Sequence, residues 1–329
     1  MAGQDSDNPI YMFMYDGDAL LSYSEGLYIQ HHKFNAVGAK TTVKFTEAAN
    51  GQKGQYNIMF TVSDTENRYI YGTGDTQNNH VDSDAGVPNA TTTNGYNWWL
   101  EEVTSLPVTI TAAQVSIKNE EGKNETKCIS TFYAPVALNV PAGVIACTGQ
   151  VVDNYLALTA IESNVIPANT GVILLANAAD TYNFAIHNEP VEAIVDNDLY
   201  GSVAKKLIAK EEGATTYYVL AKPTGKSVGF YKASWNYKGG NKINPEEDKE
   251  GDSFLNNHFK AYIPVSVADP QAAKALAFSF RGKGQGTTEI ELPTANGQQP
   301  TAVYDLQGRR VLNPTKGMYI INGKKVVIR

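Results

Sequence analysis

Two adjacent tryptophans are the residues of this sequence whose chemistry best suits ligand binding. Trp98 and Trp99 begin a run with the composition of a β-strand, which extends to Val103. Successive residues of a strand point to opposite faces, so we expect one indole in the core and the other in solvent. An exposed indole is a flat apolar platform for a sugar ring, while nearby Asp and Asn side chains can bind the sugar hydroxyls.

A polar segment before the tryptophans supplies such side chains. It runs from Gly72 to Gly95, and a loop of that length is unusual in a compact domain unless it is functional or mobile. The candidate ligand-binding residues are Trp98, Trp99, Tyr71, Asp75, Asn78, Asn79 and Asp82. Ordinary core or edge packing of the aromatic side chains is the alternative interpretation.

Patterns that would indicate catalysis are weak. Gly225-Lys-Ser227 is similar to the end of a phosphate-binding loop, but Leu220 occupies the position of that motif's first glycine. The flanking residues favour strands, so we interpret the segment as a hairpin turn. Glu101 and Glu102 are neighbours on the expected strand, so their carboxylates cannot face each other as a glycosidase pair. We predict no catalytic residues and no enzymatic activity within this chain.

Patterns that would indicate a metal site are also weak. The five histidines have no ligand spacing. Two acidic loops could hold Ca²⁺, a cation that takes roughly six to eight oxygen ligands. One loop contains Asp75, Asn78, Asn79, Asp82 and Asp84, and the other spans Asn244–Asp252 with Glu246, Glu247 and Asp248. Neither has the EF-hand pattern, so solvated loops are the alternative, and we predict no metal or other cofactor, with Ca²⁺ as the one cation worth testing.

The composition indicates a folded, strand-rich protein. Hydrophobic residues make up 42% of the 329 residues and charged residues 19%, which is typical of chains with packed cores. Tyrosine and glycine are abundant, and these residues suit strands and turns respectively. The net charge of −7 gives no basic surface for nucleic acid. No apolar run approaches the roughly 18 residues of a membrane span, so we expect neither a nucleic acid nor a membrane-spanning segment.

Short strand-like runs separated by Gly, Asn and Asp clusters predict an all-β architecture. We expect residues 1–106 to form a β-trefoil-like domain or a small β-sandwich, and residues 107–281, which Pro107 opens, to form a β-sandwich. Residues 282–300 have the composition of a linker, and residues 301–329 that of a short β tail with a hairpin turn at Asn322-Gly323. A weak helical pattern covers Lys205–Glu212.

Only two cysteines are present, Cys128 and Cys147, and they fall in consecutive predicted strands. Two buried free thiols acting as small apolar side chains are one interpretation. A single cross-strand disulfide is the other, although paired strands seldom give disulfide geometry by chance.

The tail is the most specific feature of the sequence. Val303-Tyr-Asp-Leu-Gln-Gly-Arg-Arg-Val311 and Gly317-Met-Tyr-Ile-Ile321 resemble the last residues of many secreted Bacteroidetes proteins, in the manner of a short C-terminal sorting domain of type IX secretion. Ser130-Thr-Phe-Tyr-Ala-Pro135 and Lys260-Ala-Tyr-Ile-Pro264 resemble phrases that recur in the C-terminal regions of such surface proteins, often after a glycoside hydrolase domain. Gly26-Leu-Tyr-Ile-Gln30 is loosely similar to ricin-type β-trefoil lectins.

These resemblances imply a non-catalytic extracellular accessory region, secreted or displayed at the cell surface. We expect it to be a carbohydrate-binding or spacer module of a larger glycan-degrading protein, with a glycan, the rest of that polypeptide, or the cell-surface and export machinery as partners. A stand-alone surface adhesin or structural protein is the alternative. The start at Met1 is polar and lacks the basic and apolar segments of a secretory signal, so we expect the signal to lie upstream in the parent protein.

Overall fold

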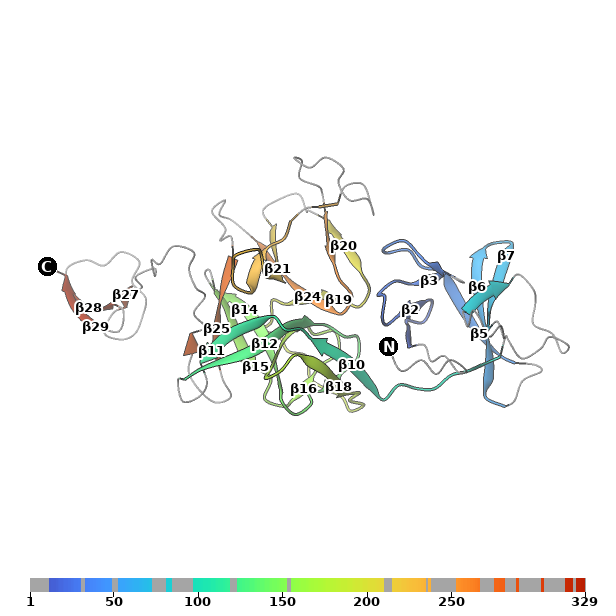
Figure 1. The fold of residues 1–329 in the computed structure, drawn as a ribbon, viewed down its shortest axis with the longest axis horizontal. Coiled ribbons are helices and arrows are strands. Elements are labelled where there is room, and N and C mark those ends of the chain that lie inside the picture. Colours follow the sequence, from blue (N-terminus) through green and yellow to red (C-terminus); the bar gives the residue numbers. More distant parts are fainter. Residues whose placement is uncertain are drawn as a thin grey trace. The chain divides into compact units, whose positions relative to one another are not determined.

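The computed structural model describes residues 12–30, 33–48, 53–72, 81–84, 97–118, 123–152, 155–209, 215–234, 236–237, 253–266, 275–281, 288–289, 303–304, 317–321 and 324–328. Within these residues every regular element is a strand (Figure 1), which confirms the all-β prediction. None of the described elements is a helix long and apolar enough to cross a membrane.

The N-terminal segment forms small antiparallel sheets. Its strands are β1 (Phe13–Tyr15), β2 (Leu20–Ser22), β3 (Ile29–Gln30), β4 (Lys33–Phe34), β5 (Thr42–Glu47), β6 (Gln55–Ser63), β7 (Glu66–Gly72), β8 (Val81–Asp84) and β9 (Trp98–Trp99). β1 pairs with β2 and β3 with β4, while β5-β6-β7-β8 form one sheet with β9 also beside β6. The segment 72–95 is therefore not all loop, because β8 pairs with β7 inside it. The choice between a trefoil and a small sandwich stays a prediction.

The central segment contains the largest sheet. Its strands are β10 (Ser105–Ile110), β11 (Gln114–Lys118), β12 (Asn124–Phe132), β13 (Leu138–Asn139), β14 (Val144–Val152), β15 (Tyr155–Ala160), β16 (Val165–Ile166), β17 (Val172–Ala176), β18 (Asp180–Ala185), β19 (Tyr200–Ser202), β20 (Lys206–Ala209), β21 (Thr215–Ala221), β22 (Gly229–Lys232), β23 (Ser253–Asn256), β24 (Lys260–Ser266), β25 (Ala275–Arg281) and β26 (Thr288–Glu289). The sheet order is β11-β12-β17-β14-β15-β25-β22-β21-β24-β19, with β26 beside β25. Its described pairs are antiparallel except β15 with β25.

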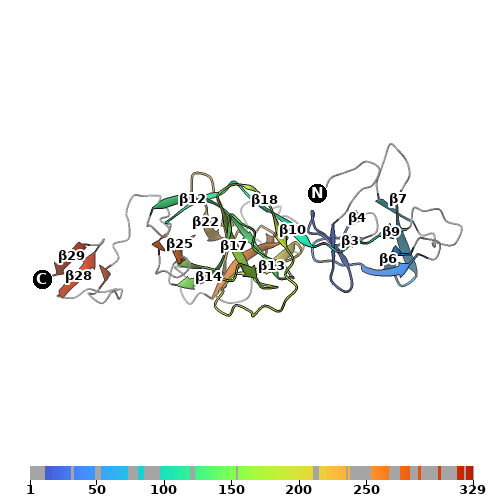
Figure 2. The same cartoon turned by 90° about the horizontal axis from the view of Figure 1, so that it is seen from below.

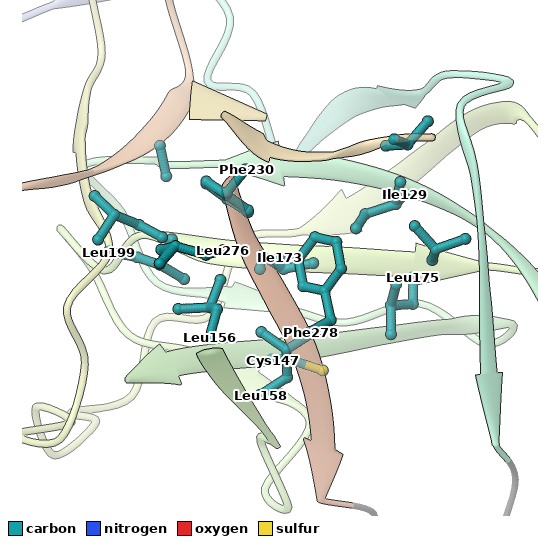
Figure 3. Close-up of a cluster of buried hydrophobic side chains, with 14 of the residues drawn as sticks. Ile129, Cys147, Leu156, Leu158, Ile173, Leu175, Leu199, Phe230, Leu276 and Phe278 are labelled. Atoms are coloured by element: carbon teal, nitrogen blue, oxygen red, sulfur yellow. The ribbon is translucent and has the colours of Figure 1, made fainter. Parts of the chain in front are cut away.

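This sheet has two halves that face each other. We call β11, β12, β17, β14 and β15 the first half, and β25, β22, β21, β24 and β19 the second half; they are the green and the yellow-to-orange strands of Figure 1. Both halves contribute to a single buried cluster, here called the inner core, which includes Ile129, Ile173, Phe230, Ile263 and Phe278. The labelled side chains in Figure 3 show how these strands converge on Phe278. A sheet whose two halves share one core has the layering of a β-sandwich.

Further strands cover the outer faces of the two halves. β17 is buried on both faces: Ile173 and Leu175 enter the inner core, while Leu174 enters a second cluster. This second cluster packs the first half against β10 and β18 through residues such as Val108 and Phe184 (Figure 2). On the second half, the two-stranded sheet of β20 and β23 is packed in a smaller cluster that includes residues of β21. Burial on both faces explains why β17 reads as a continuous apolar run.

Pro107 lies inside β10, whose described ladder partner is β18 alone, and the predicted domain boundary near residue 106 stays a prediction. Proline lacks an N–H and is tolerated on such an edge strand, and the Pro107 carbonyl accepts a hydrogen bond from the Tyr23 hydroxyl at 2.8 Å. The helical pattern predicted over Lys205–Glu212 was wrong for residues 206–209, which form β20, because pairing with β23 and burial of Ile208 override a weak local preference. Residues 210–212 lie outside the described residues.

The tail strands are β27 (Val303–Tyr304), β28 (Gly317–Ile321) and β29 (Lys324–Ile328), and they form a three-stranded antiparallel sheet. Ile321 pairs with Lys324, so β28 and β29 are antiparallel neighbours in the predicted hairpin. Residues 292–329 separate from residues 1–224 and 228–291 as a second compact unit, which includes residues 225–227. The predicted linker 282–300 lies largely outside the described residues.

Both cysteines are buried free thiols, which confirms the first of the two interpretations. Cys128 on β12 pairs with Ala176 of β17, and Cys147 on β14 pairs with Ile173 of the same strand. Cys147 belongs to the inner core and Cys128 to the cluster on the opposite face. β17 therefore separates the two thiols, and they point to opposite sides of the sheet.

We expect neither thiol to react with Ellman's reagent in the folded protein and both to react in denaturant. Burial raises the pKa of the Cys147 thiol, and the thiolate is the reactive form. Absorbance titration in native buffer and in guanidinium measures this. Ser163→Cys, at an exposed position, is the positive control, and rapid modification of the native wild-type chain would contradict the described burial.

Candidate functional site

The pairing of β9 with β6 positions the two tryptophans. Gln55 pairs with Trp99 and Tyr56 with Trp98. Just before β9, Asn97 accepts a hydrogen bond through its Oδ1 from the Asn57 Nδ2 at 3.1 Å, and Asn57 is buried. A buried amide bond of this kind fixes where β9 starts. β9 is shorter than the strand predicted from 98 to 103, since only its first two residues are paired.

Trp98 is the inward-facing ring. It packs against the cluster of Ile58, Phe60 and Ile70. Its Nε1–H donates a hydrogen bond to the Ile70 carbonyl oxygen at 3.1 Å. An indole that is half-buried needs such a partner for its single donor, so Trp98 has both an apolar and a polar anchor in the sheet.

Trp99 is the outward-facing ring, so one indole faces inward and the other outward, as strand alternation predicts. Its side chain is 57% exposed, which is high for so large an apolar residue. The ring edge lies close to Gly54, where a β-carbon would be 3.4 Å from Cζ3 of Trp99. Gly54 has φ of +92°, a conformation that other residues rarely adopt. The glycine turn therefore brings the chain beside the indole without covering it.

Other ring and amide groups share the outer face of this sheet with Trp99. Residues 55, 57, 59, 69 and 99 lie on one face, because Gln55 pairs with Trp99 and Met59 with Tyr69, and side chains alternate along β6. Tyr69 is half-buried on this face. The two paired positions on β6 are four residues apart, so Trp99 and Tyr69 are about 13 Å apart along the strand. Two aromatic rings on one polar face form an elongated surface.

The structure locates only some of the other candidate residues. The backbones of Tyr71 and Asp82 are directly paired between β7 and β8. Asp75, Asn78 and Asn79 lie outside the described residues, and so does the acidic loop Asn244–Asp252. Among described residues, no group of three or more His, Cys, Asp or Glu side chains could hold a metal ion. The Ca²⁺ prediction rests on loops beyond the described part of the chain and stays a prediction.

One motif in the sequence requires the tertiary context to interpret. Gly225-Lys-Ser-Val-Gly229 also has the G-x-S-x-G spacing of a nucleophile elbow. That elbow needs a strand followed by a helix. Here Ala221 of β21 pairs with Gly229 of β22, so the segment joins two antiparallel strands as the predicted hairpin turn. Glu101 and Glu102 are exposed beyond the end of β9.

Protein-family models, curated proteins and solved structures were each compared with this chain, and none of them matches it. The resemblance to secreted Bacteroidetes surface proteins therefore stays a prediction from the quoted sequence phrases.

Proposed function

We propose that this chain is a non-catalytic, carbohydrate-binding accessory region of a secreted or surface-displayed protein, with Trp99 as its sugar-stacking residue. The observation that carries the proposal is the exposure of Trp99, whose neighbour Trp98 packs against the core. Exposing a large aromatic ring has a solvation cost, and a polar ligand with apolar faces removes that cost.

The surroundings of Trp99 fit a sugar better than an apolar partner. Its face carries Gln55 and the exposed Thr46 and Lys44 of the adjoining strand β5. Sugar rings combine C–H faces, which stack on aromatic rings, with hydroxyls that bind amides. One stacked ring and a few hydrogen bonds give weak binding, on the order of millimolar to tens of micromolar dissociation constants.

The sequence resemblance supports the wider context of this proposal. It favours a module attached to a larger glycan-degrading protein that is exported to the cell surface. A stand-alone adhesin or a spacer is the second candidate function. The tail phrases that favour export apply equally to that candidate, so a glycan array probed with the full chain separates the two: a spacer or protein-binding adhesin gives no sugar signal.

We expect Trp99→Ala to lower affinity for the array-positive glycan at least tenfold while changing the free energy of unfolding by less than about 0.5 kcal/mol, because the ring is exposed. Calorimetric titration and thermal melting measure the two quantities. Tyr200→Ala is the matched control, since Tyr200 is also 57% exposed but lies on β19 of the central sheet. Equal affinity of wild type and Trp99→Ala would rule out the stacking role.

A further inference from the structure

A concave surface lies between residues of the first half and residues of the second half of the central sheet. The Tyr133 N–H, just after β12, donates to the Phe259 carbonyl oxygen, just before β24, at 3.1 Å. Beside this contact is an open cleft of about 660 Å³. Its described lining comes from β12, β21, β22, β23 and β24 and the residues that flank them. A cleft of this size is in the range of small-molecule sites.

Lys260 is the chemically unusual residue of the cleft. Its Nζ donates to the Ser130 Oγ at 2.9 Å and to the Thr131 carbonyl oxygen at 3.3 Å. An ammonium has three N–H donors, and the third has no partner among the described residues. Lys40 and Lys127, by comparison, pair with Asp16 and Glu125.

The environment of Lys260 leaves its positive charge without compensation. Burial lowers the pKa of its ammonium group, and no carboxylate among the described residues lies within ion-pair distance. A half-buried charge whose partners are only neutral oxygens is costly. A charged group that is partly desolvated and lines a cleft is a candidate for a binding site.

The charged side chains in the lining of the cleft are all of one sign. The charged residues among the described lining are Lys222, Lys232 and Lys260, and none of the described lining residues is Asp or Glu. The chain as a whole carries a net charge of −7, so this surface differs in sign from the average. Exposed Asn236 and Asn257 add amide groups at the margin of the cleft. Lys222 and Lys232 are exposed, so solvent screens their charges.

We propose that this cleft is a binding site for a carboxylate ligand, with Lys260 as the charged anchor. One carboxylate oxygen accepts the third N–H of Lys260, and the neighbouring amides bind the polar remainder of the ligand. A carboxylate carries one negative charge and so compensates the one half-buried ammonium, whereas a phosphate near neutral pH carries up to two and leaves excess negative charge there. The site is separate from Trp99 and does not depend on the proposed sugar-stacking role.

The test is calorimetric titration of the full chain with glucuronate, glucose and acetate at constant ionic strength. Glucuronate is expected to bind at least tenfold more tightly than glucose. If acetate binds as tightly as glucuronate, the site recognises simple carboxylic acids. If acetate binds more weakly than glucuronate, the site recognises acidic sugars. Both results support a carboxylate site. Equal binding of glucuronate and glucose, or binding of neither glucuronate nor acetate, overturns the proposal.

Variants locate the binding on Lys260. Lys260→Met removes the charge at similar volume and is expected to abolish the preference for glucuronate over glucose, whereas Lys232→Met at the exposed margin keeps it within about threefold, as screened surface charges contribute little. Should Lys260→Met fail to fold, amide NMR of the wild-type chain replaces it. Glucuronate-induced shifts at Ser130, Thr131 and Ala261 then support the proposal, and shifts confined to other residues overturn it.

Discussion

Phe278→Ala is expected to lower the free energy of unfolding of the central segment by about 3–5 kcal/mol, the usual cost of removing a buried aromatic side chain. Phe278 on β25 is fully buried in the inner core and makes an edge-on contact with Phe230, with ring centroids 5.8 Å apart. The cluster around it includes Ile173 from the first half and Phe230 from the second. The substitution therefore leaves a cavity where the two halves meet.

The position of β25 in the sheet increases the expected effect. β25 pairs with β15 of the first half in parallel and with β22 of the second half in antiparallel fashion. It is thus the strand through which the ladder passes from one half to the other. A cavity beneath this strand cannot be filled by a loop, because the backbone on both sides is held in hydrogen-bonded pairs.

Urea unfolding followed by far-UV circular dichroism measures the loss. Phe278→Leu keeps most of the buried volume and is expected to lose clearly less than Phe278→Ala, which separates the cavity effect from the loss of the ring contact. Val195→Ala, at a side chain that is 89% exposed, is the surface control. A loss below about 1 kcal/mol for Phe278→Ala, the range of ordinary mutations outside cores, would show that the two halves do not share the described core.

Trp98→Ala is expected to lower the free energy of unfolding of the N-terminal sheet by about 3–5 kcal/mol. The substitution removes apolar contacts with Ile58, Phe60 and Ile70 and leaves the Ile70 carbonyl oxygen without the indole N–H. The N-terminal sheet has little other core that could compensate for the loss, because its hydrophobic cluster has few buried residues among those described. The effect should therefore approach complete unfolding of this part.

Trp98→Phe is the matched variant, because it keeps a ring in the cluster but removes the hydrogen bond, and we expect it to cost about 1–2 kcal/mol. Hydrogen exchange of the amides in β5 and β6, measured by mass spectrometry, reports on this sheet separately from the central one. If Trp98→Ala and Trp99→Ala have the same free energy of unfolding, both rings are surface groups and the inward assignment of Trp98 is wrong.

Strand content and the faces of the tryptophans follow from the sequence, because both depend on local spacing. Alternation along a strand places the side chains of Trp98 and Trp99 on opposite faces, so the burial of one of the two rings was predictable. Which of the two faces inward depends on the pairing of β9 with β6. The antiparallel pairing of β28 with β29 was also predictable, since Asn322 and Gly323 favour the left-handed conformations of a two-residue turn.

Tertiary structure decided what pairing and burial control. The helical pattern near Lys205 yielded to a strand because β23 offers it a partner and a core. The two cysteines were predicted in consecutive strands, yet β17, which follows both in sequence, lies between them, so the pairing order excludes a disulfide. The sequence indicates only that Lys260 starts a strand. Nothing local shows that Ser130 and Thr131, some 130 residues away, bind its ammonium group. Local periodicity specifies strands and faces, whereas the neighbours of a strand are chosen by the free energy of the whole packed sheet.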